Sequence, residues 1–366
     1  MTDRPKIIAM VQLPPPMHGA AKMNQFAIEA LAKDFDLHVI EMRFVRTLSD
    51  VNRFSLRKVG LGLWLLIRLT WALPQANALY ICFAPTGFAY YRDCLYMLMA
   101  RMFRVTAVLH LHGRGLPNMR RSKWSALFQK LVFKNQTVIL LGESLCSEID
   151  GLNCKSAIIR NCLNDEDFRT LPIKPWTPHD PVRLLWLSNL FHAKGIETLL
   201  AACAILRGRD IVFTLNIAGA AGDVNDVDLD LMLGRYQVKT ATNCLGPVSE
   251  SQKRVVFEEA DLFIFPSHYA NEAQPLVVLE AMAANVPVIT SDIATLPEFV
   301  RDGETGQLCS PKDPEGLANA IIEAINSPDE TTRMRDAAYL MCQEDFSNAQ
   351  FASRLTGLFR SILRQN

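Results

Sequence analysis

The stretch DLFIFPSHYANEAQPLVVLEAMAANVPVITS, residues 261–291, predicts a buried strand, a loop, a short helix and a second buried strand in immediate succession. The apolar runs at 261–267 and 286–291 are typical of strands covered on both faces. Pro275 stands where a first helical residue tolerates proline, and Asn285 stands where a left-handed residue commonly ends a helix. The unit is therefore expected to be a right-handed crossover between two parallel strands, which predicts an α/β fold.

The start of this short helix is predicted to bind an anion. The first N–H groups of a helix have no partner within it, and here they would point toward the carboxyl edge of a parallel sheet. Together with the positive end of the helix dipole they favour a phosphate group.

Two glutamates flank this anion site. Glu272 precedes the helix, and Glu280 lies within it, about 7 Å of axial rise beyond Pro275. A sugar nucleotide carries hydroxyl groups on both sides of a diphosphate, and a carboxylate is a good acceptor for a diol. The alternative is that Glu272 is a loop charge and Glu280 an exposed helix residue. The apolar residues around Glu280 instead favour a buried carboxylate with a partner.

The rest of the chain alternates apolar runs with helical patterns, which predicts doubly wound parallel sheets. In the first half, strands are expected at 6–13, 37–42, 78–83, 106–112, 136–141 and 157–161. A second alternating series begins at 182–188 and continues through 211–219. The region between the two series contains four prolines, which indicate a linker. The predicted division is 1–165, a linker at 166–181, 182–345, and a final amphipathic segment at 346–366.

Charge is distributed unevenly, although the formal net charge of the 366 residues is zero. Residues 1–160 hold 21 Lys and Arg against 10 Asp and Glu, whereas the remainder holds 17 against 28. Basic surfaces are attracted to anionic lipid by about 1 kcal/mol per nearby Lys or Arg. The first domain is therefore expected to face a membrane, and no nucleic-acid-binding motif accompanies its charge.

Two segments are candidates for that contact. Residues 53–71 predict an amphipathic, aromatic and basic helix that is too short, and too interrupted by Arg68, to span a bilayer. Such a helix can lie in the membrane interface, or it can be a core helix with basic ends. A second basic run at 120–124 favours the membrane. Because no apolar signal segment opens the sequence and the nine cysteines suggest reduced thiols, we expect a cytoplasmic protein at the inner face of the cell membrane.

Residues 245–320 resemble the carboxyl-terminal half of a retaining glycosyltransferase of family 4, which has the GT-B fold. The matching motifs are LGPV at 245–248, ADLFIFPS at 260–267, the stretch 272–284, PVI at 287–289 and DGETG at 302–306. The resemblance implies two Rossmann-like domains facing across a cleft, the first binding the acceptor and the second the nucleotide sugar. It also implies that the C-terminal helix crosses back onto the first domain.

The resemblance further implies roles for individual residues. The implied catalytic residues are His112, Lys194 and Glu272. The implied substrate-binding residues are Gly19, Asn189, Val248, Ala273, Gln274, Pro275, Leu276, Val277 and Glu280.

Within these sets, Glu272 and the backbone at 273–277 would bind the donor sugar and its phosphates, and Glu280 the ribose. Lys194 would stabilise the departing nucleotide, unless it is an ordinary lysine at a helix start. Asn189 stands where the family often has an arginine. His112, at the tip of a strand, would hydrogen-bond the donor sugar; the alternative, a structural histidine, suits His110 better.

These features predict a metal-independent, retaining hexosyltransferase that needs no cofactor beyond its nucleotide diphosphate sugar. Attack on the same face as the leaving phosphate is expected, because no second carboxylate is evident as a nucleophile. The acidic run at 226–230 is expected to be a solvated helix start. The predicted acceptor is a polyprenyl-diphosphate-linked sugar or another glycan in surface polysaccharide assembly. A sugar-nucleotide 2-epimerase and a non-catalytic sugar-nucleotide-binding subunit remain open alternatives.

Overall fold

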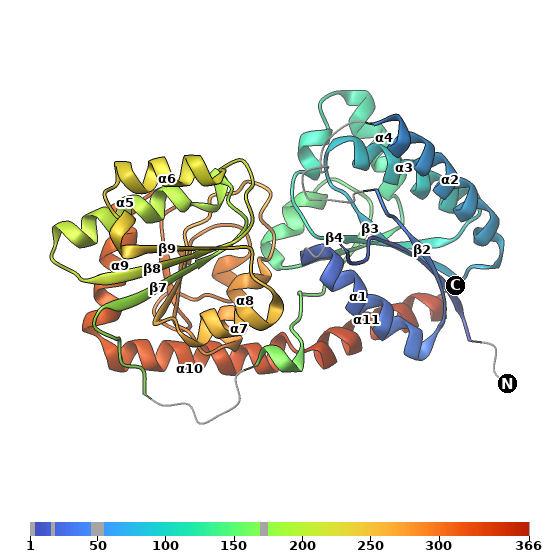
Figure 1. Ribbon diagram of the computed structural model, residues 1–366. Helices are drawn as coiled ribbons and strands as arrows, with labels where there is room; N and C mark the ends of the chain where they lie inside the picture. The colour runs from blue at the N-terminus through green and yellow to red at the C-terminus, as the bar shows by residue number, and fades with distance from the viewer. Residues whose placement is uncertain (1–3, 16–18, 45–54, 169–174, 366) are drawn as a thin grey trace. The chain divides into compact units, whose positions relative to one another are not determined.

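The computed structural model describes residues 4–15, 19–44, 55–168 and 175–365. The chain divides into two compact units, residues 1–162 with 348–366, and residues 163–347. Within the described ranges, each unit holds one six-stranded parallel sheet with helices on both faces (Figure 1). The expected class, two Rossmann-like α/β units, is therefore confirmed.

The sheet of the first unit has the order β2-β1-β3-β4-β5-β6. Its strands are β1 (Lys6–Val11), β2 (Asp36–Glu41), β3 (Ala78–Phe83), β4 (Thr106–Leu111), β5 (Thr137–Leu140) and β6 (Lys155–Ile158). The six strands predicted for this half are all present, with bounds that differ by a few residues. For the buried inner strands β1, β3, β4 and β5, largely apolar runs explain this success, because a strand covered on both faces needs no alternation.

Helices of the first unit form two layers. Its longer helices are α1 (Gly19–Asp34), α2 (Leu56–Ala72), α3 (Gly87–Met102), α4 (Lys123–Phe133) and α11 (Asn348–Gln365). Helices α1 and α11 lie side by side on one face of the sheet, and α2, α3 and α4 cover the other (Figure 1). The ring of Phe359 on α11 lies 6.2 Å, centroid to centroid, from the rings of Phe35 and Tyr80. The last helix therefore packs on the first unit, as expected.

The sheet of the second unit has the order β12-β11-β10-β7-β8-β9. Its strands are β7 (Val182–Leu187), β8 (Phe213–Ala218), β9 (Thr242–Gly246), β10 (Leu262–Phe265), β11 (Val288–Ser291) and β12 (Gln307–Cys309). Its helices are α5 (Ile196–Gly208), α6 (Asp226–Arg235), α7 (Glu250–Glu258), α8 (Leu276–Ala283), α9 (Pro314–Asn326) and α10 (Pro328–Asp345).

Strand β7 shows how the second sheet is buried on both faces. Leu184 and Trp186 join the core cluster that contains residues of α5, α6 and α9. Leu185 and Leu187 point the other way, into the cluster with residues of α7, α8 and α10. Side chains that alternate along one strand thus hold two helical layers.

Residues 175–181 of the predicted linker are attached to the second unit. Trp176 is buried, its indole N–H donates to the carbonyl of Asp261 at 2.9 Å, and its backbone N–H donates to Thr332 at 2.9 Å. This segment therefore contributes to the core of the second unit. Of the helices in the described ranges, none is long and apolar enough to cross a membrane.

Candidate active site

The start of α8 offers unpaired backbone donors at the carboxyl end of β10. The helix begins at Leu276, one residue later than predicted, because Pro275 is its N-cap with φ −70° and ψ 118°. Among the residues that the structure describes, no acceptor takes a hydrogen bond from the N–H groups of Ala273, Leu276 or Val277. The N–H of Val278 does have a partner, the carbonyl of Pro275 at 3.3 Å. Unpaired donors at a helix start favour an anion.

Lys194 and Glu272 are in direct contact although 78 positions separate them. The Nζ atom of Lys194 lies 2.5 Å from Oε2 of Glu272, and the hydroxyl of Ser267 donates to the same oxygen at 3.1 Å. The ammonium group also lies 5.4 Å from the ring centroid of Phe265 and 4.9 Å from that of Tyr269. Only 17% of the Lys194 side chain and 8% of the Glu272 side chain is exposed. An ammonium group, paired with the carboxylate of Glu272, is thus fixed close to the start of α8.

The topology of the second sheet places this pair where α/β proteins bind ligands. Counted along the chain as first to sixth, the strands of this sheet lie from β9 to β12 in the order 3-2-1-4-5-6. The direction in which successive strands are added therefore reverses between β7 and β10. Loops that follow the two strands at such a reversal diverge and leave room outside the carboxyl ends. Lys194 follows β7 and Glu272 follows β10. Two loops at the reversal therefore each supply one partner of the ion pair.

Gly195 explains why these two loops can approach so closely. Its φ is 83°, a left-handed conformation, and a Cβ there would overlap the backbone carbonyl of Pro266. The N–H of His268 in addition donates to the carbonyl of Ala193 at 2.8 Å. The residue after Lys194 must therefore be a glycine for the loops after β7 and β10 to pack together.

Glu280 is buried and paired, as its apolar neighbours predicted. It is 6% exposed, and the Nζ atom of Lys253 on α7 lies 2.9 Å from its Oε1 and 3.0 Å from its Oε2. Asn285 ends α8 with φ 56°, which confirms the predicted left-handed residue.

The other predicted residues of the second unit lie around the same edge of the sheet. Asn189 is exposed just after β7, so the loop 188–195 carries Lys194 but no arginine. Val248 is half-buried and packs on the core cluster that includes α7 and α8. Gln274 and Pro275 are buried between Glu272 and α8.

Gly19 and His112 belong to the first unit. Gly19 is the exposed first residue of α1, and residues 16–18 of its loop lie outside the described residues. His112 directly follows β4 and is partly buried.

His110, by contrast, is a structural histidine. It is fully buried, its Nδ1 lies 2.7 Å from the hydroxyl oxygen of Tyr80, and its ring centroid lies 4.0 Å from that of His112. Burial, and to a lesser degree the neighbouring His112, lowers the pKa of His110 well below its ordinary value of 6.5. Its lowered pKa favours the neutral ring, which packs against the ring of His112.

Three side chains at the candidate site were not singled out from the sequence. Ser267 and Tyr269 contact the Lys194–Glu272 pair, and Lys253 holds Glu280. Ser267 ends the quoted motif ADLFIFPS, so its position after the strand was an available signal. The sequence around Lys253 contains no comparable signal, because its partner Glu280 lies 27 positions away on another helix.

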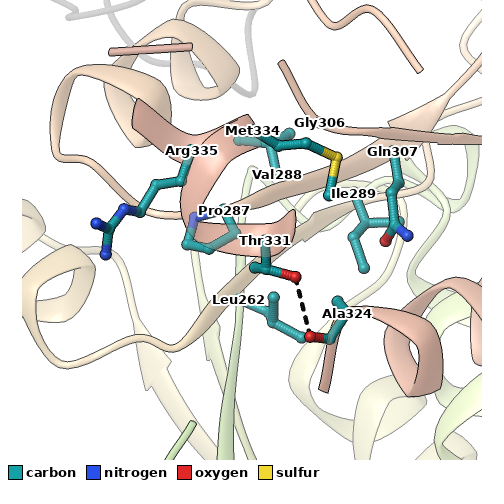
Figure 2. A pocket seen from close by; sticks show the side chains of 10 residues that line it. All are labelled: Leu262, Pro287, Val288, Ile289, Gly306, Gln307, Ala324, Thr331, Met334 and Arg335. Carbon is teal, nitrogen blue, oxygen red and sulfur yellow. Dashed lines mark hydrogen bonds between the residues drawn. The ribbon is translucent and has the colours of Figure 1, made fainter. Parts of the chain in front are cut away.

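A small cavity in the second unit lies away from this site (Figure 2). Leu262 and Val288, the first residues of β10 and β11, contribute to its lining, so it lies where the strands begin. Thr331 donates to the carbonyl of Ala324 at 2.9 Å across it. Its volume of about 10 Å³ is room for about one water molecule. This cavity is a packing gap at the opposite edge of the sheet.

Comparisons with known proteins relate the second unit, in which these residues lie, to glycosyltransferases. Residues 167–341, which include Lys194, Glu272 and Glu280, match the family model described as "Glycosyl transferases group 1". Glycogen synthase of Mycobacterium tuberculosis is 32% identical over 220 residues, 59% of this chain and 52% of that protein. The amylovoran biosynthesis glycosyltransferase AmsK of Erwinia amylovora is 27% identical over 148 residues, 39% of this chain and 36% of that protein. The chain thus spans about half the length, or less, of these curated relatives.

A solved structure extends the comparison to both units. Anabaena HepE, in complex with UDP-glucose, aligns over 97% of this chain and 99% of its own, with a TM-score of 0.74 and 19% identity. The fold is the GT-B fold. The match of residues 167–341 confirms the resemblance to glycosyltransferases for the second half of the sequence.

Proposed function

We propose that this protein is a retaining glycosyltransferase of the hexosyl type that uses a nucleotide diphosphate sugar. One observation carries the proposal: the buried Lys194–Glu272 pair lies at the reversal of the second sheet, three residues before the N-cap of α8. A diphosphate placed there meets unpaired N–H donors and an ammonium group, which together offset its negative charge.

These groups favour cleavage of the bond between the anomeric carbon and the phosphate oxygen. As that bond breaks, negative charge grows on the leaving phosphate, and Lys194 with the amides of α8 stabilises it. The acceptor hydroxyl oxygen bonds to the anomeric carbon on the same face, and its proton passes to a leaving phosphate oxygen. Glu272 binds hydroxyl groups of the sugar and orients Lys194 in this scheme. No step requires a metal ion.

Glu280 is assigned to the ribose, and the backbone at 273–277 to the phosphates and sugar. Val248 and its loop are assigned to the base. Gly19 and His112 stay predictions from the family resemblance, with His112 proposed to hydrogen-bond the donor sugar.

The proposed acceptor is a lipid-linked sugar, such as a polyprenyl diphosphate sugar, in assembly of a surface polysaccharide. The relative AmsK, whose name includes amylovoran biosynthesis, supports this choice. The outer surface of the first unit supports it more directly.

The layer formed by α2, α3 and α4 is almost free of negative charge. These three helices carry seven Lys and Arg residues and a single acidic residue, Asp93. Asp93 is fully buried and paired with Arg92 at 2.7 Å. None of these three helices therefore exposes an acidic side chain.

The same layer exposes many large apolar side chains. Trp71 is 82% exposed, Trp124 81% and Leu56 80%. Others exposed on these helices are Val59, Leu63, Trp64, Ile67, Phe88, Tyr91, Leu95, Met102, Leu127 and Leu131. Exposed apolar surface of this extent indicates an interaction site.

An anionic bilayer fits both properties of this layer. Lipid headgroups neutralise the basic residues while Trp, Tyr and aliphatic side chains enter the boundary of the acyl chains. We therefore propose that the protein works at the inner face of the cell membrane, peripherally attached through α2, α3 and α4.

The proposed reaction is tested with purified protein, a panel of nucleotide diphosphate sugars and lipid extract as acceptor. Nucleotide release that depends on the lipid acceptor, with a product whose anomeric configuration by NMR equals that of the donor, is expected. Inverted configuration would contradict retention, and rapid conversion of the donor without any acceptor would support the epimerase.

Asn189 favours one second candidate, a subunit that binds a sugar nucleotide without turnover. The absence of an arginine from the loop 188–195 removes one cation that family members often use on the diphosphate. Tight donor binding combined with no release of nucleotide in the presence of every acceptor would support this candidate.

A further inference from the structure

Lys253 makes three contacts with carboxylate oxygens at the start of α7. Its Nζ atom lies 2.9 Å and 3.0 Å from the two oxygens of Glu280, and 3.0 Å from Oε1 of Glu250. The side chain of Lys253 is 16% exposed and that of Glu280 is 7% exposed. This is a largely buried, chelating ion pair between α7 and α8.

The contacts of Lys253 limit what it can do. An ammonium group has three N–H donors, and each contact of Lys253 with a carboxylate oxygen can take one of them. The lysine is therefore committed to carboxylates and is not a phosphate ligand. A carboxylate has about four acceptor positions, so one bond from Lys253 to each oxygen does not exhaust the capacity of Glu280.

Position along the chain adds a second argument. Lys253 lies in the first turns of α7, which begins two residues after Val248, and Glu280 lies in the middle of α8. The pair thus ties the segment assigned to the base to the helix whose start is assigned to the phosphates. Under the assignments of the proposed function, the ribose of the nucleotide lies between these two elements.

We infer that Lys253 is a positioning residue that fixes the carboxylate plane of Glu280 for the two hydroxyls of the donor ribose. The inference rests on the proposed function. Lys253 also offsets part of the negative charge of Glu280 and Glu250, which weakens the repulsion between Glu280 and the adjacent diphosphate.

Binding of nucleoside diphosphates and their 2′-deoxy counterparts tests this role. The four common ribonucleoside diphosphates are titrated first, and the one bound best is compared with its 2′-deoxy form. The wild-type protein is expected to prefer the ribose form about tenfold or more, because a bond from a hydroxyl to a charged acceptor is lost in the deoxy form.

Lys253→Met is expected to reduce that preference to below about threefold, since Glu280 is no longer held in one plane. Lys253→Arg, which can also chelate a carboxylate, should retain most of it. Glu250→Ala, which removes the third contact of Lys253 and leaves Glu280 in place, is the matched control and should keep the wild-type preference. A merely structural lysine would behave differently: Lys253→Met would weaken both ligands equally and leave their ratio unchanged, which overturns the inference.

Two further outcomes keep the inference separate from the proposed function. If the wild-type protein binds none of the nucleoside diphosphates, the proposed function itself fails. If Lys253→Met does not fold, a crystal structure of the wild-type protein with the bound nucleoside diphosphate decides. Lys253 on Glu280, with Glu280 on the ribose, supports the inference; Lys253 on a phosphate oxygen contradicts it.

Discussion

Gly195 is the residue on which the geometry of the Lys194–Glu272 pair depends most directly. It combines a left-handed backbone with close contact to Pro266. Gly195→Ala is therefore expected to lower the free energy of unfolding by at least about 1 kcal/mol from backbone strain alone. Gly208, at the end of the same helix α5, has nothing within 4 Å of an added Cβ, so Gly208→Ala is the control. Equal free energies of unfolding in urea for the two variants would contradict this expectation. The loops after β7 and β10 would then be able to move apart at little cost.

His110 gives the protein a predictable pH dependence. Its folded-state pKa is lowered by burial, so the unfolded chain takes up a proton that the folded protein does not. The associated stability is complete above about pH 6.5 and is lost as the pH falls below it, by up to about 1.4 kcal/mol per pH unit.

His110→Phe keeps a ring beside Phe351 and removes this titration. Unfolding free energies measured from pH 5 to pH 7 should fall less steeply with decreasing pH in this variant. The difference in slope should correspond to about one proton fewer taken up on unfolding. An unchanged slope would show that folding does not lower the pKa of His110.

At the scale of elements, α2, α3 and α4 are expected to attach the first unit to anionic membranes. The double variant Trp71→Ser with Trp124→Ser removes two of the most exposed aromatic side chains of this layer. Partitioning onto vesicles with acidic phospholipid should weaken about tenfold or more.

Leu231→Ser provides the control, because Leu231 is 68% exposed on α6 of the other unit. It should bind vesicles like the wild-type protein, and vesicles of neutral lipid should bind all three proteins weakly. Wild-type binding that does not depend on acidic lipid, or that persists in the double variant, would contradict attachment through this layer.

Most elements could be predicted from the sequence because their signals are local. The buried strands are continuous apolar runs, and Asn285 marks the end of α8 by its own conformational preference. The helix predicted at 53–71 is α2, Leu56–Ala72, with residues 53 and 54 outside the described residues, but its outward face depends on which side packs on the sheet. That choice is made by contacts with α3, such as the bond from the hydroxyl of Tyr96 to the carbonyl of Gly62 at 3.1 Å.

The parts of the site that escaped prediction depend on distant residues. Glu272, Glu280 and Lys194 were recognisable from motifs, but the contact between Lys194 and Glu272 joins two different crossovers. In the sequence, Lys253 cannot be distinguished from a surface lysine in the first turn of a capped helix. Its contact with Glu280 becomes visible only when α7 and α8 are packed together. Trp176 appeared in a proline-rich linker, and only its bonds to Asp261 and Thr332 reveal that it is part of a core.

At the scale of the whole molecule, the first unit contains helix α11, which is separated in sequence from the rest of that unit. Phe359 of α11 is fully buried against Phe35 and Tyr80, so Phe359→Ala is expected to cost about 3–5 kcal/mol of unfolding free energy. Its neighbour Arg360 makes an exposed ion pair with Asp34, and Arg360→Ala should cost less than about 1 kcal/mol. Denaturant unfolding with a probe in the first unit measures both. Similar small losses would mean that α11 is not required for that unit.

Titration calorimetry of nucleotide diphosphate sugars against matched variants tests the central claim most directly. Lys194→Met and Glu272→Gln alter the buried pair, whereas Lys239→Met alters a lysine that is 61% exposed and paired with Asp230. The wild-type protein and Lys239→Met should bind one donor with equal affinity. Lys194→Met and Glu272→Gln should each bind it at least about tenfold more weakly, a loss of about 1.4 kcal/mol. Equal affinity in all four proteins would contradict the claim that this pair and the start of α8 hold the donor diphosphate.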